Sequence, residues 1–237
     1  MDAESRQTIL KRCEESRRCN RQIRSLIPSD RAPSLRANFA RCAIDLALEL
    51  HSALIRIAEA GEYGAAGTLL RPILEASTAG FWFVYVASCS EIQALPTVPA
   101  DNPKQDIPDL KIMLGSLTPT FPDIKKLSHG MSKGGTAKWL HKYTHGSVPQ
   151  LTRRAQGGWT EREIVATLIR GDMFAVLAAC LETVIAVNAP LETYGFNRRD
   201  ELAFEFQTTF VTDPIPYAPR GLPPAPLLKS GCGPPFA

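Results

Sequence analysis

The sequence predicts an all-α protein, an up-and-down helical bundle with an irregular, proline-rich connection and a disordered C-terminal tail. Apolar residues recur at alternating steps of three and four over several long stretches, and no strand-like alternation stands out. Capping residues and helix stops bracket these stretches. Of the 19 prolines, six fall between Cys89 and Asp123 and eight follow Val211, where they interrupt regular structure.

The first half of the chain predicts two helices. Residues 3–26 are charged and weakly apolar, which indicates a helix on the outside of the bundle. Residues 34–60 predict a second helix, with Ser34 as its N-cap and Gly61 as its stop. His51 lies on a second apolar row of that helix and is expected to be a packed core histidine. The main apolar face is expected to consist of Phe39, Ala43, Leu46, Leu50, Ala53 and Ile57.

The later apolar stretches predict buried helices and no membrane span. Residues 63–88 are apolar almost all round and indicate a central helix, which Pro72 either kinks or starts afresh. Between the proline clusters there is room for one short helix at about 107–114. Thr160 and Glu163 form a capping box for a long final helix, whose apolar run carries Glu182 at its middle.

These elements divide the chain into a basic N-terminal helix (1–30), a helical bundle (31–195) and a proline-rich C-terminal extension (196–237). The N-terminus lacks the uninterrupted apolar core of a signal peptide. Six scattered cysteines form no CxxC pair, which predicts reduced thiols, a cytoplasmic protein and no cofactor.

The charges are segregated along the chain. Between Asp123 and Glu161 there are seven lysines and arginines and no acid, so this segment carries +7 while the rest of the chain sums to −4. Such a segment favours ligands that bear phosphate, although lysine runs also occur on merely solvated surfaces. Trp139 and Tyr143 lie among the bases and are candidates for stacking on nucleic-acid bases. The candidate phosphate-binding residues here are Lys138, Lys142, Arg153 and Arg154.

Two histidines lie within this segment. His141 and His145 are four residues apart, which places both imidazoles on one face of a helix. One can act as a general base while the other contacts the ligand, or both can bind a metal ion with Glu75 as a third ligand. The surrounding positive charge disfavours a divalent cation, so no metal is expected.

Arg71 and Glu75 are ionisable residues within an otherwise apolar stretch. At a spacing of four residues they can form an ion pair, which would lower the cost of burying them. The pair fits a purely structural role equally well as a functional one, in which Glu75 orients a histidine and Arg71 binds phosphate.

The stretches "LLRPILEASTAGFW" and "WLHKYTHGSVPQLTRR" resemble the HEPN-like group of small bacterial helical proteins, over about residues 34–189. The resemblance implies a homodimeric bundle and, in active members, RNA cleavage or nucleotide binding, sometimes at toxin–antitoxin or phage-defence loci. The family's catalytic signature is an arginine, four to six residues and a histidine. Here the nearest equivalent is Lys138, which precedes His145 with six residues between them.

Two hypotheses of different classes follow. In the first, the protein binds RNA or a nucleotide and cleaves RNA without metal, with His145 as general base, His141 assisting, Glu75 orienting an imidazole and Arg71 neutralising phosphate. In the second, the protein is a non-catalytic dimerisation, antitoxin-like or defence-associated module, and the same residues satisfy a polar core. A metal-binding bundle is a further alternative.

Overall fold

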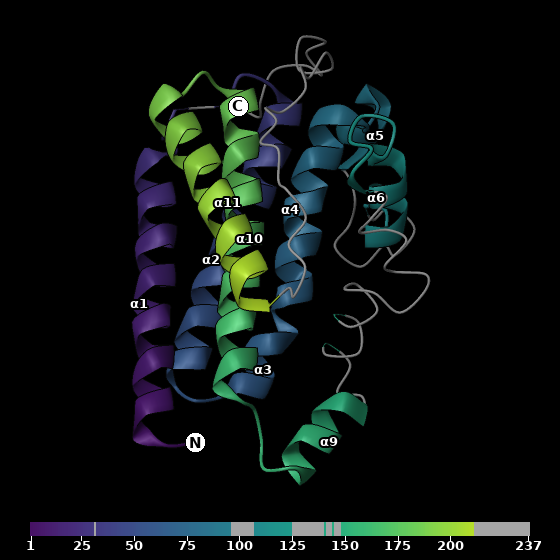
Figure 1. The fold of residues 1–237 in the computed structure, drawn as a ribbon. Helices are drawn as coiled ribbons and strands as arrows, with labels where there is room; N and C mark the ends of the chain where they lie inside the picture. Colours follow the sequence, from purple (N-terminus) through teal and green to yellow (C-terminus); the bar gives the residue numbers. More distant parts are fainter. Residues whose placement is uncertain (31, 96–106, 125–139, 141–143, 145–147, 211–237) are drawn as a thin grey trace.

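The computed structural model describes residues 1–30, 32–95, 107–124, 140, 144 and 148–210, and over these residues it is an all-α bundle without strands. Long helices run side by side along the bundle, α3 and α9 lie at one end, and α5 and α6 lie beside the other end (Figure 1). The helices are α1 (Ala3–Leu26), α2 (Leu35–Glu59), α3 (Tyr63–Thr68), α4 (Leu70–Tyr85), α5 (Cys89–Ala94), α6 (Leu110–Leu117), α9 (Val148–Ala155), α10 (Glu161–Ile185) and α11 (Ala189–Phe210).

Helix α2 has the predicted ends but buries a different face. The Ser34 side chain accepts a hydrogen bond from Ala37 N, and Gly61 follows the helix with a φ of +89°. The second apolar row is the one that faces the core, and His51 on it is fully buried, as expected. The face predicted as the main one lies along the flank, and its Leu46 is 49% exposed. Both rows have the same helical period, so spacing alone did not distinguish them.

Pro72 lies at the start of a new helix, which is one of the two outcomes predicted for it; the other was a kink. Helix α3 ends at Thr68 and α4 begins at Leu70, so Pro72 falls in the first turn of α4, where its missing N–H costs no helical hydrogen bond. Further along α4, a Cβ on Gly80 would lie 2.8 Å from Leu181 Cδ2 and 3.7 Å from Ala43 Cβ. A glycine at position 80 therefore lets α2, α4 and α10 approach closely.

Helix α10 is the central element of the bundle. Its capping box forms as predicted, with Glu163 N donating to Thr160 Oγ1 and the Glu163 carboxylate accepting from Thr160 N. It packs against α1, α2, α4 and α11, so its buried residues lie all round rather than on one stripe. Val187, just after the helix, is fully exposed. Among the described helices, α10 alone is long and apolar enough to cross a membrane, but 78% of its apolar window is buried in the bundle.

The first and last described helices are packed more closely than expected. Ile9, Cys13 and Ile23 of α1 are fully buried, so α1 is an integral bundle helix rather than an outer one. Helix α11 was not predicted, and it runs through the boundary placed between residues 195 and 196 while packing on α10 and α1. Leu202 within it is fully buried. The first part of the expected extension therefore belongs to the bundle.

The proline-rich connection contains two described helices where the sequence predicted one. The predicted short helix is α6, three residues later than expected, with Asp109 as its N-cap. Helix α5 was missed, although Ser88 and Glu91 form a capping box at its start. The tail predicted to be disordered, residues 211–237, lies outside the described residues, as do residues 96–106.

Candidate functional site

Most of the predicted catalytic and stacking residues lie outside the described residues. These are His141, His145, Trp139 and Tyr143. Two of the predicted phosphate-binding residues, Lys138 and Lys142, also lie outside the described residues. The described residues between them, Leu140 and Thr144, are helical, and Leu140 is 1% exposed. Two of the three residues of the possible metal site, His141 and His145, are thus not described. The described residues contain no group of three or more potential metal ligands.

Arg71 and Glu75 form the ion pair that their spacing predicted. Arg71 Nε donates to Glu75 Oε1 at 2.7 Å. Their side chains are 24% and 36% exposed, however, so the pair lies on a flank of α4 and not inside the bundle. An exposed pair at this spacing contributes only about 0.3–0.5 kcal/mol to stability.

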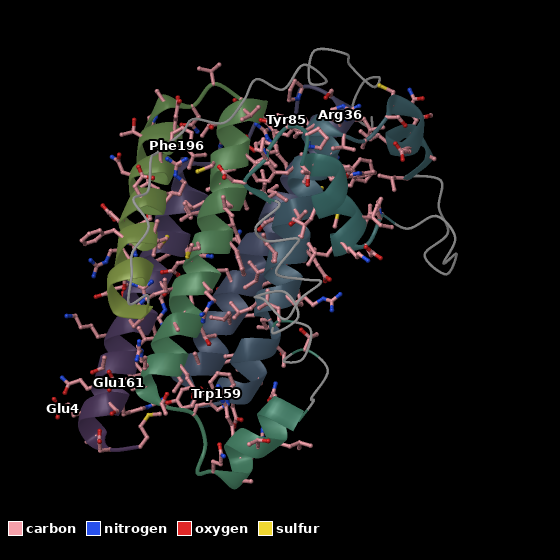
Figure 2. The ribbon with its side chains drawn as sticks, turned by 45° about the vertical axis from the view of Figure 1, so that its right-hand side comes forward. Glu4, Arg36, Tyr85, Trp159, Glu161 and Phe196 are labelled. Carbon is pink, nitrogen blue, oxygen red and sulfur yellow. The ribbon has the colours of Figure 1, made fainter. Side chains whose placement is uncertain are left out.

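Arg153 and Arg154 lie on α9, which is attached to the end of the bundle. Gln150 Nε2 donates to Gly64 O at 3.3 Å, and a Cβ on Gly64 would lie 3.5 Å from an Arg154 nitrogen. Glycine at position 64 thus allows α9 side chains to approach the α3 backbone. Figure 2 shows Trp159 at this end of the bundle, opposite the end that carries Arg36 and Tyr85.

Arg153 is held by two partners at this end. Its guanidinium lies 5.2 Å from the centre of the Trp159 ring and donates to the Glu163 carboxylate. Partial burial raises the pKa of Glu163, but the hydrogen bonds from Arg153 and from Thr160 N outweigh it and hold that pKa below its usual value. Glu163 therefore stays ionised at neutral pH and opposes the charge of Arg153. Arg154 is exposed.

A buried polar cluster that the sequence analysis missed is centred on Asp172 of α10. The Asp172 carboxylate is fully buried. Arg12 Nη2 donates to its Oδ2 at 2.5 Å and Ser16 Oγ at 3.1 Å, while His51 Nε2 lies 2.8 Å from its Oδ1. Arg198 approaches the same carboxylate at 3.8 Å. Three helices besides α10 thus supply the partners of a single buried charge.

The hydrogen bonds of His51 define its tautomer. Asn20 Nδ2 donates to Leu48 O at 2.9 Å and lies 3.1 Å from His51 Nδ1, so Nδ1 accepts and carries no proton. The proton is then on Nε2, which donates to Asp172. This arrangement has a nitrogen–carboxylate hydrogen bond like that of a catalytic dyad, but His51 is fully buried and has no access to a substrate. The cluster is a buried polar core with one face toward α11.

A second buried ion pair joins α2 to α10. Arg41 donates to Glu182 Oε1 from Nη2 at 2.6 Å and from Nε at 2.9 Å, and Nε also lies 3.2 Å from Oε2. Glu182 is fully buried, and burial raises its pKa while Arg41 opposes that rise. This pair explains how Glu182 can lie in the middle of an apolar run.

An apolar groove runs along the flank between α2 and α4. Its volume is about 360 Å³. Helix α2 contributes Phe39, Ala43, Leu46 and Leu50, and α4 contributes Pro72, Ala76, Ala79 and Phe83, with Glu75 at its edge. The face that α2 was expected to bury is therefore the wall of an open groove.

The fold and these sites define an all-α bundle protein with two buried ion-pair clusters and an open apolar flank. The chain belongs to the Family of unknown function DUF6988, whose model matches residues 44–204. The matched segment runs from α2 to α11 and includes His51, Asp172 and Glu182. No curated protein and no solved structure matches the chain.

Proposed function

We propose that this protein binds a phosphate-bearing ligand, RNA or a nucleotide, at the end of the bundle where α9 packs against α3. The observation that carries the proposal is the segment 124–160, which has seven lysines and arginines and no acid. A local excess of positive charge attracts nucleic acid whatever its sequence. The described part of this segment, α9, is fixed to the bundle by Gln150 and Arg153 and carries Arg154 exposed to solvent.

The described residues of the segment have distinct roles in this proposal. Arg154 contacts phosphate directly. Arg153 is partly neutralised by Glu163, so its role is to orient the Trp159 ring, which offers a surface for base stacking. Lys138 and Lys142 add phosphate contacts, and Trp139 and Tyr143 add stacking. A cytoplasmic location belongs to the same proposal and is supported by the five described cysteines, all of which are free.

Cleavage of RNA without metal is an extension of the binding proposal and rests on the HEPN-like resemblance. His145 would remove the proton from a 2′-hydroxyl, His141 would assist, and Arg71 would neutralise phosphate. The Glu75 carboxylate is already bonded to Arg71, so it orients a histidine only through its remaining oxygen lone pairs. A role in toxin–antitoxin or phage-defence systems rests on the same resemblance.

Arg154→Ala is expected to weaken binding of a fluorescein-labelled single-stranded RNA of about 20 nucleotides, measured by fluorescence anisotropy. Each phosphate contact contributes about 0.7 to the slope of log K against log salt for single strands, so the slope should fall by about that amount. Arg21→Ala is the matched control, because Arg21 is 63% exposed on α1. It should leave affinity and slope unchanged. Salt-independent binding, or equal losses in both variants, would contradict the proposal.

The extension to cleavage has its own readout in the same preparation. His145→Ala should abolish turnover of the labelled RNA while leaving the melting temperature and the anisotropy titration unchanged. Equal turnover by the wild-type protein and by His145→Ala would contradict the proposed nuclease activity without contradicting the binding proposal.

A second candidate function, self-association as an interaction module, is favoured by the α2/α4 groove. On the face of α2 that forms one wall of the groove, the apolar residues are placed symmetrically in the sequence about position 48. This symmetric set continues along α2 past the end of the groove. If two α2 helices pack antiparallel across this position, Leu46 meets Leu50 of the second copy and Ala43 meets Ala53. Phe39 then meets Ile57 at both ends. Large residues face large ones and alanine faces alanine, as a close isologous helix contact requires.

Leu46→Glu is expected to convert a dimer to a monomer, measured by size-exclusion chromatography with light scattering at about 50 µM, the concentration range of moderate affinities. The substitution places two carboxylates beside the two-fold axis in an apolar contact. The fold should tolerate it, because Leu46 is 49% exposed. Ile112→Glu, at a 58% exposed position on α6 outside the groove, is the control and should keep the wild-type mass. A monomeric wild-type protein would exclude this interface.

A further inference from the structure

A polar cavity of about 500 Å³ lies between α1 and α11, at the open side of the Asp172 cluster. Its charged lining consists of three arginines, Arg12, Arg18 and Arg198, and three glutamates, Glu15, Glu201 and Glu205. The volume falls within the range of pockets that bind small molecules. Among the described residues, its lining includes none from the segment 124–160 and none that line the apolar groove.

Arg12, which lines the cavity, has one buried N–H donor without an acceptor among the described residues. Arg12 is 5% exposed, and its Nη2 is bonded to Asp172. Its Nη1 is shared between Glu15 at 3.3 Å and Glu205 at 3.2 Å. Its Nε–H has no hydrogen-bond partner among the described residues. An unsatisfied buried N–H is unfavourable, so the guanidinium of Arg12 has hydrogen-bonding capacity that its described partners do not use.

The rim of the cavity offers a further guanidinium. Arg18 is exposed on α1, and within the described part of the chain it takes part in no hydrogen bond or ion pair. Arg198, on the opposite helix, is bonded to Glu201 at 2.9 Å. The free charge at the rim is therefore that of Arg18, while the glutamates remain 34–63% exposed and accessible to a cation.

The charge balance of the lining selects the ligand class. The six charged residues sum to zero. The other two polar lining groups are neutral, because burial raises the pKa of Cys19 to about 11 and also raises the pKa of Tyr194. A simple anion would face three carboxylates, and a simple cation would face three guanidinium groups. A molecule that carries both charges satisfies each set.

We propose that the cavity between α1 and α11 binds a small zwitterion of the α-amino-acid class. The ligand carboxylate faces the guanidinium groups of Arg12 and Arg18, and the ligand ammonium group faces the glutamates of α11. The inference is independent of the phosphate-binding proposal, because none of these residues lies in the segment 124–160.

The test is isothermal titration of the full-length protein with each of the common α-amino acids, with acetate, methylammonium and inorganic phosphate as single-charge probes. At least one amino acid is expected to bind with a Kd below about 1 mM. The single-charge probes are expected to bind at least about tenfold more weakly, since each lacks the second charge-assisted contact. Absence of binding by every amino acid at about 10 mM, or equal binding by acetate or phosphate, would overturn the proposal.

Arg18→Met distinguishes a ligand site from a salt-bridge network that merely attaches α11 to α1. Because Arg18 has no described partner, the variant should keep the wild-type melting temperature while losing about tenfold in affinity, the size expected for one charge-assisted hydrogen bond. Arg21→Met, on the same helix and outside the cavity, is the control and should bind as the wild type does. Unchanged affinity in Arg18→Met would show that the cavity is not the site.

Discussion

Asp172→Ala is expected to destabilise the protein by about 3–5 kcal/mol, the range for removing one member of a buried charge pair. The substitution leaves the guanidinium of Arg12 without its shortest bond and leaves the Nε2–H of His51 without an acceptor. Both side chains are buried, so each is left with a buried donor that has lost its acceptor. Urea denaturation at pH 7, followed by far-UV circular dichroism, measures the change.

The control for Asp172 is another aspartate with an arginine partner. Asp200 of α11 pairs with Arg199 at 2.9 Å but is 37% exposed, so Asp200→Ala should cost no more than about 1 kcal/mol. Asp172→Asn keeps the volume but is expected to remain strongly destabilising, because an amide cannot accept from both Arg12 and His51 through two oxygens. If Asp172→Ala fell within about 1 kcal/mol of the control, the cluster would not be a stabilising core.

Arg41→Ala is expected to lower the free energy of unfolding by a similar amount, about 3–5 kcal/mol at pH 7. The reason is that it leaves the fully buried Glu182 carboxylate without its counter-charge. Burial then raises the pKa of Glu182 without opposition from Arg41. A carboxyl group whose pKa is higher in the folded than in the unfolded state stabilises the fold at low pH and loses that contribution as pH rises through the folded-state value. The difference in unfolding free energy between the wild type and Arg41→Ala should therefore become smaller as the pH is lowered from 7 to 5.

A double variant separates the charge from the packing at this site. Arg41→Ala combined with Glu182→Gln should recover part of the lost stability at pH 7 and remove the pH dependence, since no buried charge remains. Arg24→Ala is the matched control, because its pair with Asp45 is 40% and 70% exposed. Its stability should stay within about 1 kcal/mol of the wild type at both pH values. A pH-independent deficit in Arg41→Ala would show that Glu182 is not the cause.

The sequence was sufficient for the helical class and for several helix ends, because both depend on nearby residues. Ser34, Thr160 and Glu163 cap their helices through bonds that span three residues. The pairing of Arg71 with Glu75 has the same local origin. Their exposure was not predictable from spacing, because it depends on which flank of α4 another helix covers.

The sequence did contain a signal for the missed cluster. Asp172 interrupts the apolar run of α10 ten residues before Glu182, just as Glu182 itself does. A buried acid requires a cationic or hydrogen-bonding partner. The cationic partner of Asp172 is Arg12, 160 positions away, within a helix that the sequence predicted on the outside of the bundle.

The all-α class, the caps and the segregation of positive charge into one stretch were determined by the sequence alone, because each follows from residues within a few turns of one another. Only the tertiary structure decided which row of α2 faces the core, that α1 and α11 belong to the bundle, and which groups neutralise Asp172 and Glu182. The physical reason is that burial and ion pairing depend on distances between helices. Helical periodicity gives the faces of each helix but not the neighbour that each face meets.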